Sequence, residues 1–297
     1  MDSYTREINR TLSTSASPLI DVSAIDGSIR LRGEERNDVY LHLSARIRAE
    51  SAQEADEMLA RIERGIAMRD NVLKIETPRE HAGGHHFFRG LRDVLSALND
   101  NAHIDFELVA PRGARADLKV VNGEASAEGV LGDVNVQTIN GAIRLANVGG
   151  NVGVRTVNGR ISIERCDGGV SVNQKNGDVE VRRVRGHLAL RILNGNLRIV
   201  EPGSAVDARA LSGEMSYRGA VRDDVTLNSS HGSIQCYVPR DARFSLDAMS
   251  HLGSVSSELP VNESGGGGRG QHAPHVSLRS QTGSIALRVL EPASAAP

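Results

Sequence analysis

The feature that most constrains the fold of this chain is an internal repeat of 18 residues. An Asn-Gly or Ser-Gly step recurs along the middle of the sequence, and the glycines of successive steps lie 18 positions apart. The steps are Asn122-Gly123, Asn140-Gly141, Asn158-Gly159, Asn176-Gly177, Asn194-Gly195 and Ser212-Gly213. Looser glycine steps continue the series at Gly232, Gly253 and Gly283. Unrelated hairpins would need no fixed period, so the spacing indicates equivalent, stacked structural units.

Apolar residues occupy the same positions in each repeat. Counted from the Asn-Gly glycine, they fall at +2, +4 and +7 and again at +11, +13 and +16, and a second glycine recurs at +9. The two sets are nine residues apart, so each repeat is predicted to consist of two equivalent nine-residue halves. The alternation at +2 and +4, and at +11 and +13, is typical of a strand with one buried face. The Asn-Gly step is a turn signal because both residues tolerate positive φ.

A strand, a turn, a second strand and a second turn make one closed coil. Coils stacked about 4.8 Å apart would satisfy one another's backbone hydrogen bonds. Each coil would bury about six aliphatic side chains, and each of these contributes ~1.5–3 kcal/mol. The predicted fold is therefore all-β: a single-stranded β-solenoid, or β-helix, with 18-residue coils. The asparagines of the turns would stack into an amide ladder whose role is structural.

The two cysteines fit the same frame. Cys166 falls in the +7 row and Cys236 falls at +4 from Gly232, so both are predicted to be small buried apolar residues rather than nucleophiles. Two cysteines 70 positions apart form neither a disulfide framework nor a zinc knuckle. Lys175 is an exception in the +16 row, and we expect its side chain to point outward at a corner of the coil.

The repeat and its flanks divide the chain into four regions. Residues 1–121 are predicted to form an N-terminal α+β cap with the first strands, which would cover an open end of the array. Within the cap, Ser51 and Glu54 form a capping-box pattern, and apolar residues at helical spacing predict one helix over about 52–68. The other regions are regular coils over 122–237, irregular C-terminal coils with a glycine-rich loop over 238–290, and a disordered tail over 291–297.

An amphipathic insert is predicted over about 86–99, where apolar residues share one helical face. Its exposed apolar side chains suggest a docking helix for a partner or a membrane surface. The candidate docking residues are Phe87, Phe88, Leu91 and Leu95. A helix folded back over the solenoid or its end is the alternative, and it is the one that we favour. Gly90 weakens the prediction of a helix in this segment.

Composition excludes several classes of function. Lys and Arg total 35 against 37 Asp and Glu, a formal net charge of −2, which gives no support to nucleic-acid binding. Aromatic residues are 3% with no Trp, so stacking platforms for bases or sugars are hard to build. No secretory signal and no transmembrane stretch are visible, so a cytoplasmic location is the default expectation. Surface association and peripheral membrane contact stay open.

No metal, cofactor or catalytic site is predicted. Nine-residue halves suggest calcium-binding β-rolls, but the turns lack the required column of Asp residues. Hexapeptide acyltransferases share the coil length but show aliphatics six apart. The histidines at His81, His85 and His86, and those at His272 and His275, are interpreted as solvated loop residues rather than metal ligands, because oriented partners are not apparent.

One pair of carboxylates suggests an enzyme. Asp223 and Asp224, followed by Ser230-His231-Gly232, faintly resemble the acid pair and His-Gly segment of pectin-hydrolysing β-helices. Paired carboxylates on one face could act as acid and base on a glycosidic bond. The matching companion segments and aromatic subsites are missing, so a polysaccharide-active β-helix enzyme is a minor alternative.

One outward row of the coils carries arginine. Its members are Gln137, Arg155, Asn173, Arg191 and Arg209. Guanidinium groups at a regular spacing could bind an anionic partner, and we select Arg155, Arg191 and Arg209 as the candidate binding row. A solvated face without a partner is the more common role of such a row.

The repeat residues also carry a family resemblance. The stretches GDVNVQTINGAIRL, GNVGVRTVNGRISI and SVNQKNGDVEV, and the earlier IDVSAIDGSIRLRG, are similar to the bacterial DUF4097 family of β-strand repeat proteins, also labelled putative adhesin. The resemblance covers about residues 18–290. It implies a β-helix-like, non-catalytic domain with envelope or stress associations in some relatives, and no established functional residues.

Three functions remain open from the sequence. The leading hypothesis is a non-catalytic β-solenoid that gives a rigid surface for contact with a protein partner or a cell-envelope component, adhesin-like by resemblance. The first alternative is a self-assembling structural scaffold that oligomerises through the solenoid ends, because uncapped sheet edges can polymerise. The second alternative is the polysaccharide-active enzyme.

Overall fold

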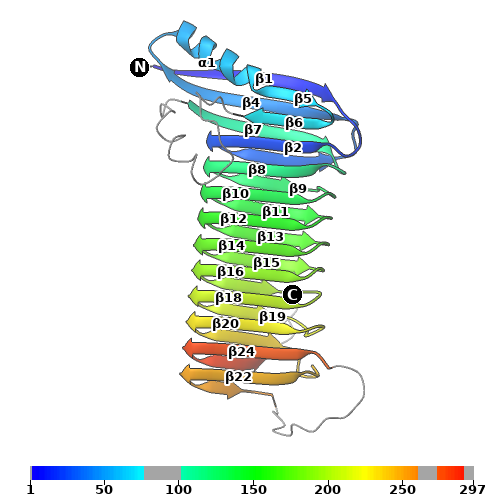
Figure 1. Cartoon of the computed structure of the whole chain (residues 1–297), viewed down its shortest axis with the longest axis vertical. Helices are drawn as coiled ribbons and strands as arrows, with labels where there is room; N and C mark the ends of the chain where they lie inside the picture. The colour runs from blue at the N-terminus through cyan, green and yellow to red at the C-terminus, as the bar shows by residue number, and fades with distance from the viewer. Residues whose placement is uncertain (1, 77–101, 260–272, 291–297) are drawn as a thin grey trace, which may run out of the picture. The chain divides into compact units, whose positions relative to one another are not determined.

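The computed structural model describes residues 2–76, 102–259 and 273–290. Within these ranges it contains one α-helix and 25 β-strands. The chain divides into two compact units, which we call unit 1 (Met1–Ala142) and unit 2 (Ile143–Pro297). The predicted all-β solenoid is confirmed, and each unit is described separately (Figure 1).

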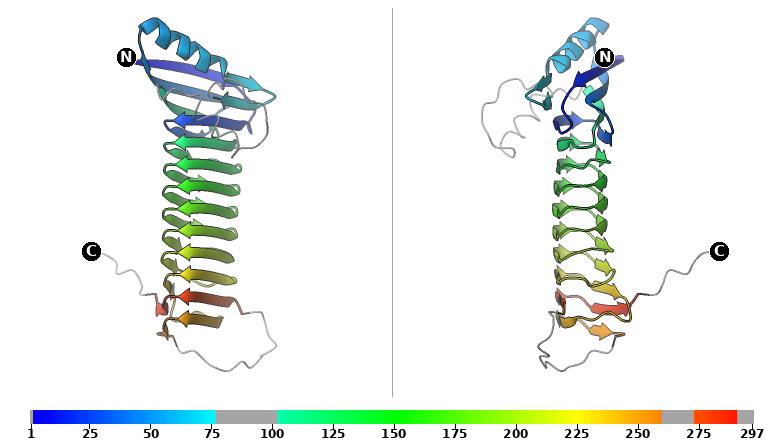
Figure 2. Two further views of the ribbon diagram at one scale, coloured as in Figure 1. Left: turned by 60° about the vertical axis from the view of Figure 1, so that its left-hand side comes forward. Right: turned by 90° about the vertical axis from the view of Figure 1, so that its right-hand side faces the viewer.

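Unit 2 consists of two facing layers of parallel strands, which Figures 1 and 2 show stacked rung upon rung. The spatial order of the first layer, sheet A, is β11 (Ile143–Val148), β13 (Ile161–Cys166), β15 (Val179–Val184), β17 (Leu197–Val200), β19 (Met215–Arg218), β21 (Ile234–Val238), β25 (Ile285–Val289) and β23 (Val255–Ser257). The order of the second, sheet B, is β12 (Val152–Asn158), β14 (Val170–Asn176), β16 (Leu188–Asn194), β18 (Val206–Ser212), β20 (Val225–His231), β24 (His275–Thr282) and β22 (Ser245–Leu252).

The register of the regular coils follows the sequence repeat. In sheet B, Val152 lies beside Val170, and in sheet A, Ile161 lies beside Val179, each pair 18 residues apart. The +2, +4, +11 and +13 rows are buried as predicted. Cys166, in the +7 row, and Cys236, in the +4 row, are buried as well. The chain thus advances one strand in each sheet with every repeat.

The predicted +16 row is wrong, because the inward row is +15. Thr156, Gln174 and Ile192, all at +15, are 2–5% exposed, whereas Leu193 and Leu211, at +16, are 48% and 43% exposed. The strands of sheet B run seven residues without interruption, so strict alternation carries the inward face from +13 to +15. The exposed position of Lys175 agrees with the prediction for that residue.

The strands of sheet A lose this alternation, which makes the two halves of a coil inequivalent. Arg165 and Arg183, at +6, have φ of 56° and 54°. A left-handed residue at this point turns the next side chain back into the core, so that +7 is buried at Cys166 and Val184. The prediction of two equivalent nine-residue halves is therefore wrong.

The Asn-Gly turns stack as a ladder. In unit 2 the Asn176 side-chain amide donates to Asn158 Oδ1 at 2.8 Å, and the Asn194 amide donates to Asn176 Oδ1 at 2.9 Å. Gly195 has φ of 140°, and a Cβ at this residue would lie 1.9 Å from the Gly177 carbonyl oxygen. The turn therefore needs glycine for both its conformation and its close approach to the preceding coil.

Unit 1 begins with antiparallel strands and continues as parallel ones. One sheet has the order β1 (Asp2–Ser13), β4 (Asp38–Ala49), β7 (Ala102–Pro111), β3 (Ile29–Glu34) and β9 (Ala125–Glu128). The other has the order β10 (Val134–Asn140), β8 (Arg115–Asn122), β2 (Leu19–Asp26), β6 (Val72–Glu76) and β5 (Ile66–Arg69). The β1–β4 and β4–β7 pairs are antiparallel, whereas β7, β3 and β9 are parallel neighbours.

The single described helix, α1 (Ala52–Arg64), packs in unit 1 against β4 and β1. Ser51 caps the helix as predicted: its Oγ accepts from the Glu54 backbone N–H at 3.2 Å, while the Glu54 carboxylate accepts at 2.8 Å from the N–H of Glu50, the residue before the cap. The helix ends before the predicted residue 68, because the chain turns at Gly65 and β5 pairs with β6 from Ile66 onward.

Some predictions fall outside the described residues. These are the amphipathic insert over 86–99 with Phe87, Phe88, Leu91 and Leu95, the glycine-rich stretch around 265–270, the tail over 291–297, and His81, His85, His86 and His272. In the described ranges, no helix combines the length and apolar character that crossing a membrane requires.

Candidate functional site

The outer face of sheet B carries a column of arginines, one strand after another. Parallel pairing places Asn173 beside Arg155, Arg191 beside Asn173, and Arg209 beside Arg191. The column continues through Asn228 to Arg279 on β24. All four of its arginines are exposed. We call Arg155, Asn173, Arg191, Arg209, Asn228 and Arg279 the arginine column.

The four arginines differ in their partners. Arg209 binds Asp207 of its own strand, with its Nε 3.2 Å from Oδ1, and Arg279 binds Asp247 at 3.0 Å. Arg155 and Arg191 have no acidic partner among the residues that the structure describes. Their guanidinium groups therefore keep their hydrogen-bond donors available in water, and each can take a carboxylate or phosphate in a bidentate manner.

Two arginines on the outer face of sheet A have carboxylate partners. Arg182 lies 2.5 Å from Glu180, and Arg183 lies 3.2 Å from Glu201 and 3.8 Å from Glu164. These ion pairs join positions in the same strand or in the next coil, where the repeat brings opposite charges together. Arg182 and Arg183 are thus neutralised, whereas Arg155 and Arg191, like Arg198 and Arg218 of sheet A, have no acidic partner among the described residues.

A partly exposed apolar column runs beside the arginine column. Leu193 and Leu211 occupy neighbouring strands, and Val157 and Lys175 continue the row. At the far end, Arg209, Asn228, Met249, His251 and Arg279 help to line a shallow groove of about 360 Å³. The face therefore combines cationic, hydrogen-bonding and apolar groups.

Charge is distributed unequally along the sequence. Residues 143–297 contain 18 Lys and Arg against 14 Asp and Glu, a formal charge of +4. Residues 1–142 contain 17 against 23, a formal charge of −6. The net charge of −2 is therefore the sum of a negative unit 1 and a positive unit 2. Positive charge on unit 2, which carries the arginine column, would attract an anionic partner.

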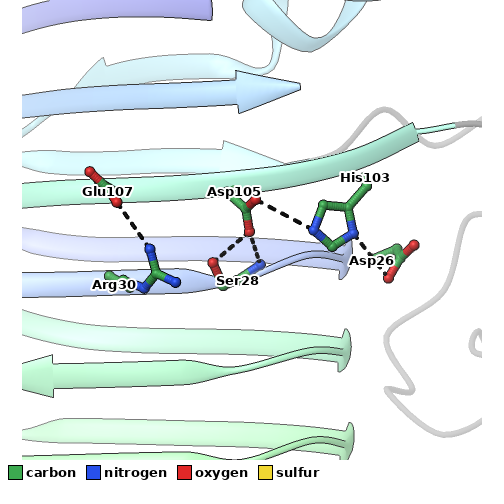
Figure 3. Close-up of polar contacts among 6 residues, drawn as sticks. All are labelled: Asp26, Ser28, Arg30, His103, Asp105 and Glu107. Carbon is green, nitrogen blue, oxygen red and sulfur yellow. Dashed lines mark hydrogen bonds and ion pairs between the residues drawn. The ribbon is translucent and has the colours of Figure 1, made fainter. Parts of the chain in front are cut away.

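A second polar cluster lies in unit 1, between β7 and the turn from β2 to β3 (Figure 3). Ser28 donates to Asp105 Oδ1 from its hydroxyl at 2.5 Å and from its backbone N–H at 2.9 Å. His103 Nε2 lies 3.4 Å from Asp105 Oδ2, and His103 Nδ1 lies 3.5 Å from Asp26 Oδ1. Arg30 pairs with Glu107 at 3.0 Å one step along the same strands.

The environment of Asp105 favours its charged form. Burial alone would raise the pKa of this carboxyl. The two hydrogen bonds from Ser28 and the charges of His103 and Arg30 outweigh burial, so the pKa of Asp105 lies below its ordinary value of 3.8. No local pattern in the sequence predicts this cluster, because Ser28 and Asp105 are 77 positions apart.

This cluster does not have the geometry of a nucleophilic triad. The Ser28 hydroxyl donates to a carboxylate rather than to the imidazole, and the lowered pKa of Asp105 makes this carboxylate a weak base for the hydroxyl proton. The contacts instead tie β7 to the turn before β3, across a large separation in sequence. We therefore assign the cluster a structural role in unit 1.

The residues of the enzyme alternative are not brought together. Asp223 accepts hydrogen bonds from Ser204 Oγ at 3.3 Å and from the Asp224 N–H at 2.9 Å, and Asp224 accepts from the His275 N–H at 2.8 Å. Both carboxylates thus brace turns. Asp224 precedes β20 and His231 ends it, so a seven-residue strand of about 23 Å separates them.

Neither the thiols of Cys166 and Cys236 nor His275, the one described histidine of the two histidine clusters noted in the sequence, has a reactive arrangement. Burial raises the pKa of Cys166 to about 11 and that of Cys236 to about 12, the opposite of what a nucleophilic thiol needs. His275 Nδ1 contacts Ser245 Oγ at 2.8 Å on the surface. In the described part of the chain, no group of three or more His, Cys, Asp or Glu residues is placed to hold a metal ion.

Three solved structures are similar to this chain over most of its length. A putative adhesin from Bacteroides fragilis is 13% identical, with 96% of this chain and 97% of that chain covered and a TM-score of 0.43. A putative adhesin from Parabacteroides merdae is 11% identical, with 96% and 95% covered and a TM-score of 0.43. A putative lipid binding protein from Parabacteroides distasonis is 13% identical, with 96% of each chain covered and a TM-score of 0.42. No curated protein matches the chain. The model of the family described as Toastrack DUF4097 matches residues 19–288, and the chain belongs to that family.

Proposed function

We propose that this chain is a non-catalytic binding protein whose unit 2 holds an anionic partner on the arginine column. The sheet beneath the column supports this role, because its strands fix the spacing of the side chains before any ligand arrives. A preorganised surface loses less conformational entropy on binding than a mobile one. The partner would be a cell-envelope component or a protein that presents repeated acidic groups, an adhesin-like contact.

The observation that carries the proposal is the pair Arg155 and Arg191. Both are exposed, they lie two strands apart in one ladder, and neither has an acidic partner in the described residues. Two strand spacings correspond to about 10 Å between their backbones. A ligand with negative groups at this repeat can engage both arginines at once and gains affinity from the shared attachment.

The experiment measures binding to two anionic probes. Vesicles of phosphatidylglycerol and phosphatidylcholine, with pure phosphatidylcholine as the neutral control, represent an envelope surface, and polyglutamate represents an acidic protein. We expect binding to one anionic probe, weakened by added salt and reduced at least tenfold in Arg155→Glu/Arg191→Glu. Binding to neither probe by the wild type would refute the proposal.

A matched variant separates the column from bulk charge. Arg198→Glu/Arg218→Glu changes the net charge of unit 2 by the same amount, and both residues are exposed on the outer face of sheet A. We expect this control to retain most of the binding. Equal losses in the two variants would show that general positive charge, rather than the arginine column, attracts the probe.

Self-assembly is a second candidate function. It is favoured by the terminal coil of unit 2, where β22 and β23 are the last strands of their sheets. The polysaccharide-active enzyme receives no comparable support, because its carboxylates brace turns far from His231.

A further inference from the structure

The terminal coil of unit 2 leaves one edge of each sheet without a neighbour. β22 pairs only with β24, and β23 pairs only with β25, among the strands that the structure describes. Figure 1 shows β24 between β20 and β22. The chain therefore forms the outermost strand, β22, before it forms β24, which lies one coil further in. The outer sides of β22 and β23 therefore present backbone N–H and C=O groups that a further strand could satisfy.

The core is also open at this end. Leu246, Ala248 and Val255 line a cavity of about 380 Å³ together with core residues of the adjacent coil. Leu252 is 73% exposed and Val255 is 48% exposed, whereas Ile285, which lies beside Val255 in the adjacent coil, is 1% exposed. The last coil thus fails to bury its own apolar residues, which leaves a driving force for a contact with another surface.

The chain segment that connects this coil to the next is poor in apolar residues. Positions 260–272 read PVNESGGGGRGQH, in which Val261 is the one large aliphatic residue. This segment lacks the side chains needed to bury Leu252 and Val255. Composition therefore points to an occupant from outside the coil.

The edge also lacks the usual protection against pairing. Exposed edges are normally blocked by lysine, proline or unpaired charge. β22 and β23 contain no lysine or proline, and Asp247, their one acidic residue, is already bound to Arg279. The edge strand β1 of unit 1, by contrast, carries Asp2, Arg6, Glu7 and Arg10.

We infer that a second copy of this chain docks on the terminal coil, with β22 pairing antiparallel to the second copy's β22 about a two-fold axis at Met249. Asp247 and His251 are both two residues from Met249, so each would face the other residue type across the axis. Leu246 would lie opposite the second copy's Leu252 on the inner face. The edge is therefore self-complementary in polar and in apolar character.

The contact deepens the second candidate function and is independent of the arginine column. A two-fold contact uses the same surface on both copies, so it closes after one addition. Unit 2 would accordingly form a closed pair through this end rather than an open filament.

Two measurements test the inference. The mass in solution, followed by light scattering against concentration, should rise from 31.8 kDa to about twice that value and then stay constant. In Met249→Cys the two sulfurs would meet on the axis, since directly opposed antiparallel residues have Cα atoms about 4.5–5.5 Å apart, within disulfide range. We expect a disulfide-linked dimer on a non-reducing gel.

Controls keep the result interpretable. Ser171→Cys places an exposed thiol on the same face of sheet B, away from the terminal coil, and should not cross-link. Cys166 and Cys236 are buried and should not contribute. Leu252→Lys/Val255→Lys changes exposed side chains only, and should leave a folded monomer by circular dichroism.

Several outcomes would overturn the inference. A monomer at 100 µM protein removes the contact. Mass that grows steadily with concentration indicates a filament instead of a pair. A dimer in which Met249→Cys does not cross-link, or in which Ser171→Cys cross-links equally, places the interface elsewhere. Loss of anionic binding with the dimer intact would contradict only the proposed function.

Discussion

Replacing neighbouring residues of β16 tests which row faces the core. Ile192, at +15, is 3% exposed, and Leu193, at +16, is 48% exposed. Ile192→Ala removes three buried carbon groups at ~0.8 kcal/mol each, and the cavity left behind adds to this loss. We expect the free energy of unfolding to fall by about 3 kcal/mol. Leu193→Ala removes a side chain that is already half in water and leaves no closed cavity, so the loss should be about 1 kcal/mol or less.

Urea unfolding followed by far-ultraviolet circular dichroism measures both values. The midpoint should shift far more for Ile192→Ala, with the slope m unchanged in both variants. A change in slope would mean that part of the solenoid unfolds separately, and the midpoints would then not be comparable. Losses equal within 0.5 kcal/mol, or a larger loss for Leu193→Ala, would refute the assignment of +15 as the inward row.

Three further perturbations have clear expected outcomes. Val152→Asp should unfold or aggregate the protein, because an unpaired buried charge costs several kcal/mol, whereas Arg155→Asp on the same strand should change stability by less than about 0.5 kcal/mol; thermal melts of both decide. Cys166 and Cys236 should resist a thiol reagent at pH 8 in the folded protein and react in urea, and rapid reaction when folded would contradict their burial. Asp105→Asn should lower the melting temperature at pH 7. Because the folded pKa of Asp105 is depressed, its contribution is present above the unfolded value and lost as pH falls below it, so the difference should vanish in acid and a constant difference would argue against charge.

The repeat allowed the buried rows of both sheets to be predicted where simple alternation decides them. The failure at +16 has a specific cause, which is the left-handed residue at +6 in one half of the coil. Positive φ at Arg165 and Arg183 has no sequence signature, because arginine rarely adopts it and the surrounding coil imposes it. When this left-handed residue is not taken into account, burial at +7 suggests a nine-residue period. That period places the last buried residue of the second half at +16 instead of +15.

Other parts could not be predicted because they depend on contacts distant in sequence. The pairing of Ser28 with Asp105 follows from β7 lying beside β3. The order of the last coils could not be predicted either. Gly253 and Gly283 depart from the 18-residue spacing, and no local sequence pattern indicates that β24 lies between β20 and β22. The outward position of the candidate row could be predicted because outward positions repeat as regularly as inward ones.

In the solenoid, inward-facing residues stabilise the fold, whereas outward-facing residues are available for other contacts. Inward residues hold the coils together, so an outward arginine contributes to stability mainly through a neighbouring carboxylate. Arg183 has such neighbours in Glu164 and Glu201. Arg155 and Arg191 lie beside the neutral Asn173, and the ladder offers them no acid. Their charges therefore add weak mutual repulsion without a compensating pair. Folding does not explain these two residues, whereas the proposed anionic partner would.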